Sequence, residues 1–162
     1  MTNNALAFIA LCNEYCAAVE HARETEKTDL VQSLLRLLPR IYIAATDLAA
    51  DLPGEAYIDG ALDEDYYESV RHSLEMVLGE DDSYLEVFEE DMKYSDTPIG
   101  ASLAEGLADL FQVFYNLLET VRDAPDELAD EALAAVRDDF ANYWGQTLCN
   151  VMRPLHHIYY QS

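Results

Sequence analysis

The chain has 162 residues, 51% of them apolar, so it is long enough to bury a core without the help of metal ions or disulfides. Its 32 acidic and 9 basic residues give a formal net charge of −23. This charge argues against direct binding to nucleic acid or to an anionic membrane, and it favours basic protein partners or cations.

Two features of the whole sequence indicate a protein of the cytoplasm, and a third bears on its domain organisation. No apolar stretch reaches the roughly 20 residues that a membrane-spanning helix needs. The three cysteines show no disulfide-like spacing, which is typical of a reducing compartment. No repeat or low-complexity segment divides the chain, so we expect one domain over residues 1–162.

The first predicted helix runs from about Asn4 to His21. Cys12 and Cys16 lie four residues apart in the middle of its apolar face. That spacing would suit two zinc ligands, but free cysteine commonly behaves as a small buried hydrophobe. We therefore interpret both cysteines as core residues.

A second helix is expected from Thr28, as its N-cap, to about Asp51. Pro39 falls inside its apolar pattern and removes a backbone donor, so we expect a kink or a split near Leu37. The following segment 52–62 contains one proline and two glycines and is predicted to be the longest loop.

The third predicted helix begins after Asp63 and ends at Gly79, which is a typical C-terminal stop. One of its faces carries a candidate metal site, because four polar side chains fall within about 80° of each other. They are Asp65, Glu68, His72 and Glu75. The apolar residues lie on the opposite face, so these side chains point away from the expected core, and we favour a solvated face.

A short helix is predicted over Ser83–Met92. Its Glu86 and Glu89, together with Glu127 and Asp130, have the paired-carboxylate spacing of magnesium-dependent helical nucleotide pyrophosphatases. Such spacings arise easily in an acidic chain, and the second pair lies in the first turn of a helix, where acids complement the dipole.

A helix near residues 98–122 is predicted to be the centre of the fold. Asp96 or Thr97 is expected to cap it, with Pro98 in its first turn. Its polar side chains form one narrow stripe, and the rest of its surface is apolar or small, which requires neighbours on several sides. The stripe consists of Ser102, Glu105, Asp109, Gln112, Asn116 and Glu119. Within it, Glu105 and Asp109 are the best-placed carboxylates for an inward-facing metal site, and either water or another helix could cover them.

The last predicted helix opens at Pro125 and extends to about Ile158, with a close helix crossing at Gly145 and a bent or frayed end at Pro154. Near the end of this helix, three basic residues form the most concentrated positive charge in the sequence. These are Arg153, His156 and His157, and they complement the helix C-terminus and also form a candidate anion or partner site.

Four motifs spread along the chain resemble a known protein family. They are LLxLLP at 34–39, GEDDxYL at 79–85, EDMxYSDTP at 90–98 and WG at 144–145. The chain resembles a bacterial family of small acidic helical proteins that is catalogued only as a domain of unknown function. The resemblance implies an all-helical fold and a bacterial origin, and it implies no activity, cofactor or catalytic residue.

Together these patterns predict an all-α bundle of five to six helices around the helix near 98–122. Three functions fit such a bundle. The first is a non-enzymatic interaction module that binds a protein partner or a second copy of the chain through an apolar or acidic face. The second is a divalent-cation-dependent hydrolase, with Glu105, Asp109, Glu68 and His72 as candidate ligands. The third is a DNA mimic that inhibits a basic protein. We favour the first, without a cofactor, because the carboxylates are not oriented toward a common site.

Overall fold

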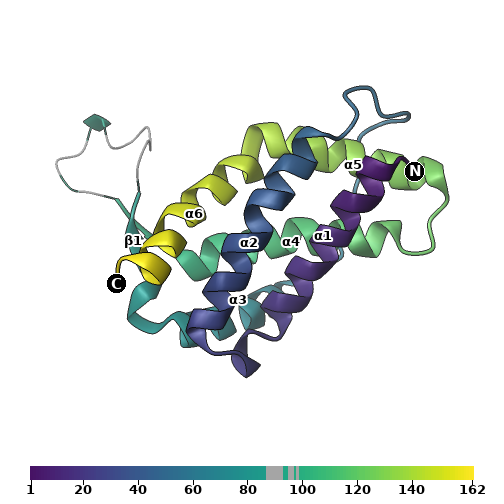
Figure 1. Cartoon of the computed structure of the whole chain (residues 1–162). Coiled ribbons are helices and arrows are strands. Elements are labelled where there is room, and N and C mark those ends of the chain that lie inside the picture. The colour runs from purple at the N-terminus through teal and green to yellow at the C-terminus, as the bar shows by residue number, and fades with distance from the viewer. Residues whose placement is uncertain (87–92, 95–96, 98) are drawn as a thin grey trace.

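The computed structural model describes residues 1–86, 93–94, 97 and 99–162 and shows an all-α protein (Figure 1). The helices are α1 (Asn3–Glu20), α2 (Lys27–Thr46), α3 (Glu64–Leu78), α4 (Leu103–Val121), α5 (Asp126–Asp139) and α6 (Gly145–Tyr160). Short 3₁₀ helices span Ala22–Glu24 and Gly79–Asp82, and two short strands, β1 (Ser83–Leu85) and β2 (Gly100–Ser102), form a small hairpin. Within the described ranges, no helix is both long and apolar enough to cross a membrane.

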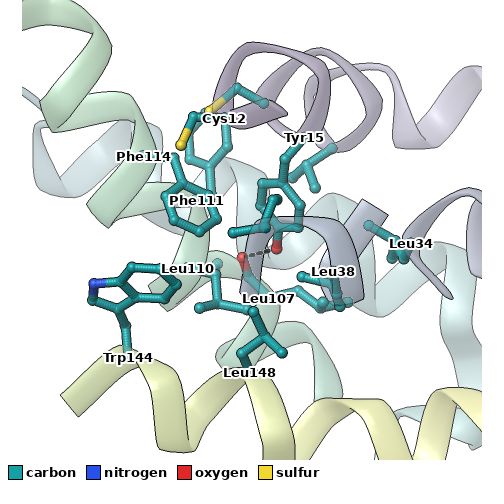
Figure 2. Packing of buried hydrophobic residues seen from close by; sticks show 14 of the residues in the cluster. Cys12, Tyr15, Leu34, Leu38, Leu107, Leu110, Phe111, Phe114, Trp144 and Leu148 are labelled. Atoms are coloured by element: carbon teal, nitrogen blue, oxygen red, sulfur yellow. Dashed lines mark hydrogen bonds between the residues drawn. The ribbon is translucent and has the colours of Figure 1, made fainter. Parts of the chain in front are cut away.

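Helix α4 is the centre of the bundle, as its composition predicts. It packs against α1, α3, α5 and α6 and buries most of its apolar side chains. Phe114 of α4 stacks edge-on against Tyr15 of α1 and against Trp144, with ring centroids 5.2 Å apart in both pairs. Figure 2 shows this aromatic cluster and the Tyr15 hydroxyl, which donates a 2.7 Å hydrogen bond to the main-chain oxygen of Leu107.

The start of α4 differs from the prediction. The helix begins at Leu103 rather than near residue 98, and Ser102 is its N-cap, with its hydroxyl accepting a 3.1 Å hydrogen bond from the Glu105 amide. The Asp82 carboxylate accepts a second hydrogen bond, of 2.6 Å, from the Ala104 amide. Ser102 and Glu105 have the S-x-x-E spacing of a capping box, so this start was readable in the sequence.

The predicted helix over Ser83–Met92 is wrong in its first part. Residues 83–85 are strand β1, which pairs antiparallel with β2 in the register Ser83 with Ser102 and Leu85 with Gly100. Strand β2 leads directly into the capped start of α4, and its backbone pairs with residues 83–85. Residues 87–92, including Glu89, lie outside the described part of the chain.

Helix α2 is continuous through Pro39, so the predicted split near Leu37 is absent. The helix begins at Lys27 rather than after a Thr28 cap, and it ends at Thr46, five residues before the predicted Asp51. The loop that follows is held against the bundle by hydrogen bonds, one of them between main-chain groups. The Tyr57 amide donates to the Glu131 carbonyl oxygen at 3.0 Å.

Helices α5 and α6 are joined through a π-helical turn, Phe140–Trp144, where the sequence predicted one regular helix. Gly145 serves this turn rather than a helix crossing, because a Cβ there would lie 2.5 Å from the Phe140 carbonyl oxygen. The close crossing is at Gly106, where a Cβ would lie 2.6 Å from Cγ1 of Val151 on α6. Helix α6 continues past Pro154 to Tyr160.

Candidate functional site

The polar stripe of α4 is partly covered by other elements. Asp109 is half-buried, and its carboxylate accepts a 2.5 Å hydrogen bond from the Tyr67 hydroxyl of α3. The Tyr143 side chain, from the π-helical turn, lines a cavity together with Asp109 and opposes the rise in the pKa of its carboxylate. Farther along the stripe, the Asn116 side-chain oxygen accepts a 2.8 Å hydrogen bond from the Leu62 amide. Asp109 therefore faces neighbouring helices, whereas Glu105 is exposed to solvent.

Burial raises the pKa of Asp109, and the hydroxyls of Tyr67 and Tyr143 oppose that rise only in part. The pKa values of the two tyrosines are raised as well. Burial and the Asp109 carboxylate raise the pKa of Tyr67 and of Tyr143, so both hydroxyls remain protonated at neutral pH.

Glu105 and Asp109 share a cavity of about 330 Å³ at the N-terminal end of α4, which we call the Asp109 cavity. Its lining also includes Ser102, Thr147 and Asn150. The arrangement brings two of the predicted candidate ligands to one concave surface with hydroxyl and amide groups. Such a surface suits a polar or cationic group.

The other two candidate ligands, Glu68 and His72, lie elsewhere. The Glu68 carboxylate forms a 2.6 Å ion pair with Arg71, and His72 Nδ1 lies 3.9 Å from Glu75. Both side chains are at least half exposed on the outer face of α3, as the helical spacing predicts. Within the described residues, no three histidine, cysteine, aspartate or glutamate side chains are grouped to hold a metal ion.

The cysteines are placed as the apolar pattern predicts. Cys12 and Cys16 are buried in the core between α1 and its neighbours, whereas Cys149 is exposed on α6. Burial raises the pKa of both core thiols, so they stay protonated and unreactive.

The three basic residues near the C-terminus each contact a different group. Arg153 donates to the Leu85 carbonyl oxygen of β1, and its guanidinium lies 5.8 Å from the centroid of the Tyr84 ring. His156 stacks on Tyr160 with ring centroids 4.8 Å apart. Nδ1 of His157 lies 3.2 Å from Gln161 Oε1. Arg153 thus ties the hairpin to α6, and the two histidines contact other side chains.

Sequence reasoning missed an apolar groove between α2 and α6, which run antiparallel to each other (Figure 1). We call it the α2–α6 groove, and its volume is about 390 Å³. Its lining consists of Pro39, Tyr42 and Ile43 of α2 and Leu148, Cys149 and Met152 of α6. The Ile43 side chain is 61% exposed, which is unusual for a large aliphatic residue beside other apolar groups.

Two arginines, Arg36 and Arg40, lie on the exposed side of α2 next to this groove. Within the described part of the chain, they are the arginines that have no hydrogen bond or ion pair. The remaining arginines contact a carboxylate, a main-chain carbonyl or a methionine sulfur, as shown by Arg23, Arg71, Arg122, Arg137 and Arg153. Two unpaired cations beside exposed apolar side chains are notable in a chain with 32 acidic residues.

Comparisons with known proteins give one family and a similar crystal structure. Residues 1–161 match a family described as "Domain of unknown function (DUF5063)". The crystal structure of protein BF1032 from Bacteroides fragilis is similar, with a TM-score of 0.86 and 28% sequence identity. The match covers 99% of this chain and 94% of that one. A search of curated proteins gives no match.

Proposed function

The chain belongs to the family described as "Domain of unknown function (DUF5063)", and we propose that it is a non-enzymatic interaction module that docks a protein partner in the α2–α6 groove. The single observation that carries this proposal is the exposed apolar groove flanked by unpaired Arg36 and Arg40. We place the function in the bacterial cytoplasm, where the three free cysteines would stay reduced.

The chemistry of the groove fits protein recognition. Two packed helices form its walls, and an apolar segment laid between them would remove Ile43, Tyr42 and Met152 from water. Exposed apolar side chains in a concave patch are the usual centre of a protein interface, with charged groups at the rim.

The charge at the rim specifies the partner more closely than the net charge does. The overall charge of −23 favours a basic partner, but the groove presents Arg36 and Arg40. A segment that carries carboxylates beside its apolar side chains would pair with both arginines, whereas a basic segment would be repelled.

Site-specific photo-crosslinking in the cytoplasm of the source cell would test this proposal. A benzophenone amino acid would replace Ile43 in one protein and Met76 in a matched control. Met76 is 62% exposed on α3, close to the 61% of Ile43. We expect discrete adducts from position 43 that disappear when Arg36 and Arg40 are both changed to Glu. Equal adduct patterns from positions 43 and 76, or no adduct from position 43, would contradict docking in this groove.

A specific observation also supports a second candidate, the divalent-cation-dependent hydrolase. Glu105 and Asp109 line one cavity, and the raised pKa of Asp109 is the kind of perturbation found at functional carboxylates. The Tyr67 hydroxyl already occupies a lone pair of the Asp109 carboxylate, however, which leaves fewer of its oxygen positions for a cation. We therefore rank this candidate second.

A further inference from the structure

We propose that the occupant of the docking surface on α2 is a second copy of this chain, paired antiparallel with the first through the exposed side of α2. This inference rests on the docking function proposed above and names its partner. Three features of α2 carry it, namely the spacing of its exposed residues, the order of their charges and the exposed isoleucine between them.

The first feature is the spacing. Arg36, Arg40, Ile43 and Asp47 follow one another at intervals of four, three and four residues, and all four are exposed. At about 100° per residue they lie along one narrow stripe of the helix. Intervals of four and three are those of the seam along which two helices pack against each other. Asp47 keeps right-handed helical backbone angles as the C-cap of α2, so the stripe extends to it.

The second feature is the order of charges along that stripe. Arg36 and Arg40 precede Ile43, whereas Asp47 and Asp51 follow it, and all of these charged residues are exposed. Asp51 lies in the turn after the helix, where Arg137 fixes the chain by donating to the Ala49 and Ala50 carbonyl oxygens at 2.7 and 2.5 Å. One half of the face is therefore positive and the other half negative.

Two antiparallel copies can be related by a twofold axis that passes between Ile43 and Ala44. The positive half of each stripe then faces the negative half of the other. Arg40 and Asp47 lie at equal distances before and after that axis, about 5 Å along the helix. An antiparallel second copy would thus bring its Asp47 opposite Arg40. The same contacts repeat on the other side of the axis, which is the self-complementarity that a symmetric dimer requires.

The third feature is the apolar centre. Ile43 lies next to the axis, so pairing places the two Ile43 side chains together and covers this exposed side chain on both copies. The chain itself thus supplies both the carboxylates that the unpaired arginines need and the apolar surface that the groove exposes. A basic foreign partner would supply neither.

The test is sedimentation velocity of the full chain over a range of concentrations, with two charge reversals. We expect the mass to rise from 18.3 kDa toward twice that value as concentration increases. Arg40→Asp alone, or Asp47→Arg alone, places like charges opposite each other and should weaken the dimer by roughly tenfold or more. An equimolar mixture of the two single variants restores opposite charges at every contact, so it should form dimers again. Thermal melts of the single variants would show that both remain folded.

Two results would overturn the inference. One is a mass of 18.3 kDa at every concentration. The other is a dimer that the single reversals do not weaken or that mixing does not restore. Either result, combined with crosslinking of position 43 to a different protein, would leave the docking function intact and reject the second copy as its occupant. A dimer that is weakened by substitution of Ile43, and that forms again when the two charge variants are mixed, supports both the docking function and the second copy as its occupant.

Discussion

The hydroxyl of Tyr15 on α1 donates a 2.7 Å hydrogen bond to the main-chain oxygen of Leu107, in the N-terminal half of α4. Both residues are fully buried, and the contact joins the N-terminal helix to the centre of the bundle (Figure 2). Burial is the main cause of the raised pKa of Tyr15, so the hydroxyl keeps its proton throughout the physiological range. This bond orients α1 on α4 within the apolar core.

Tyr15→Phe should therefore lower the free energy of unfolding by about 1–2 kcal/mol, because it removes a buried hydrogen bond while keeping the ring. Urea unfolding followed by circular dichroism would measure the loss. Tyr160→Phe is the matched control, since Tyr160 is 66% exposed at the end of α6. Equal midpoints for the Tyr15→Phe variant and the wild type would show that this bond does not contribute to stability.

Gly106 should be intolerant of any side chain, because an added Cβ would lie 2.6 Å from Cγ1 of Val151. Gly106→Ala is expected to destabilise the protein by about 1–3 kcal/mol through overpacking, despite the higher helix propensity of alanine. Gly60→Ala is the control, since no atom lies within 4 Å of the added Cβ there.

A double-mutant cycle would assign the loss to the α4–α6 crossing. In a Val151→Ala background the obstructing methyl group is absent, so Gly106→Ala should cost clearly less than in the wild type. Purely additive effects of the two substitutions would contradict a clash between these two positions.

Asp109 should make the stability of the protein fall as the pH rises from the acidic range. Its folded-state pKa is raised above the ordinary value of 3.8, mainly by burial. The folded state thus binds this proton more tightly than the unfolded state, and the destabilisation appears as the pH rises through the folded-state pKa. Asp109→Asn, which still accepts a hydrogen bond from Tyr67, should lose less stability over the interval just above pH 3.8.

Urea midpoints of the wild type and of Asp109→Asn, measured across that interval, would check this expectation. Asp109→Ala provides the comparison in which the acceptor of the Tyr67 hydroxyl is also removed. Parallel pH profiles of the wild type and Asp109→Asn would mean that Asp109 titrates alike in the folded and unfolded states.

The sequence predicts the helices of this fold well where their ends carry local signals. Asp63 caps α3 through a 2.7 Å hydrogen bond from the Tyr66 amide, and Gly79 ends it with a positive φ, as expected. The start of α4 is an exception, because Pro98 predicts a helix from about residue 98, whereas the Ser102 hydroxyl caps a helix that begins at Leu103. Helix α2 passes through Pro39 without a break. It packs against both α1 and α6, and this packing outweighs the backbone hydrogen bond that the proline removes.

The candidate sites were less predictable, since they depend on which helices meet. The spacing of α4 placed Asp109 on a polar stripe, but its partners Tyr67 and Tyr143 come from distant parts of the chain. The α2–α6 groove depends on the rotation of α2 between its two neighbours, which buries Ile41 and exposes Ile43. The helical spacing already separates these two isoleucines, because Ile41 repeats with Leu34 and Leu38, but only the structure shows that α6 completes a groove beside Ile43.

The thermal melt should be insensitive to divalent cations if the protein is an interaction module. We expect the same melting temperature in EDTA and with added Mn²⁺ or Mg²⁺, and no bound transition metal in elemental analysis. A melting temperature that falls on chelation and recovers with the ion would instead support the hydrolase candidate. In that case, Glu105→Gln should abolish the recovery, while Glu68→Gln on the outer face of α3 should not.

Cys149 should be the thiol that reacts in the folded protein. Cys12 and Cys16 are buried with raised pKa values, whereas Cys149 is exposed in the lining of the α2–α6 groove. A maleimide reagent should label one site in the native state and all three cysteines in denaturant, as mass spectrometry would show. Because a bulky adduct on Cys149 fills the groove, labelling should weaken docking there, and Cys149→Ser should be insensitive to the reagent. Full docking by the labelled protein would place the interaction surface elsewhere on the molecule.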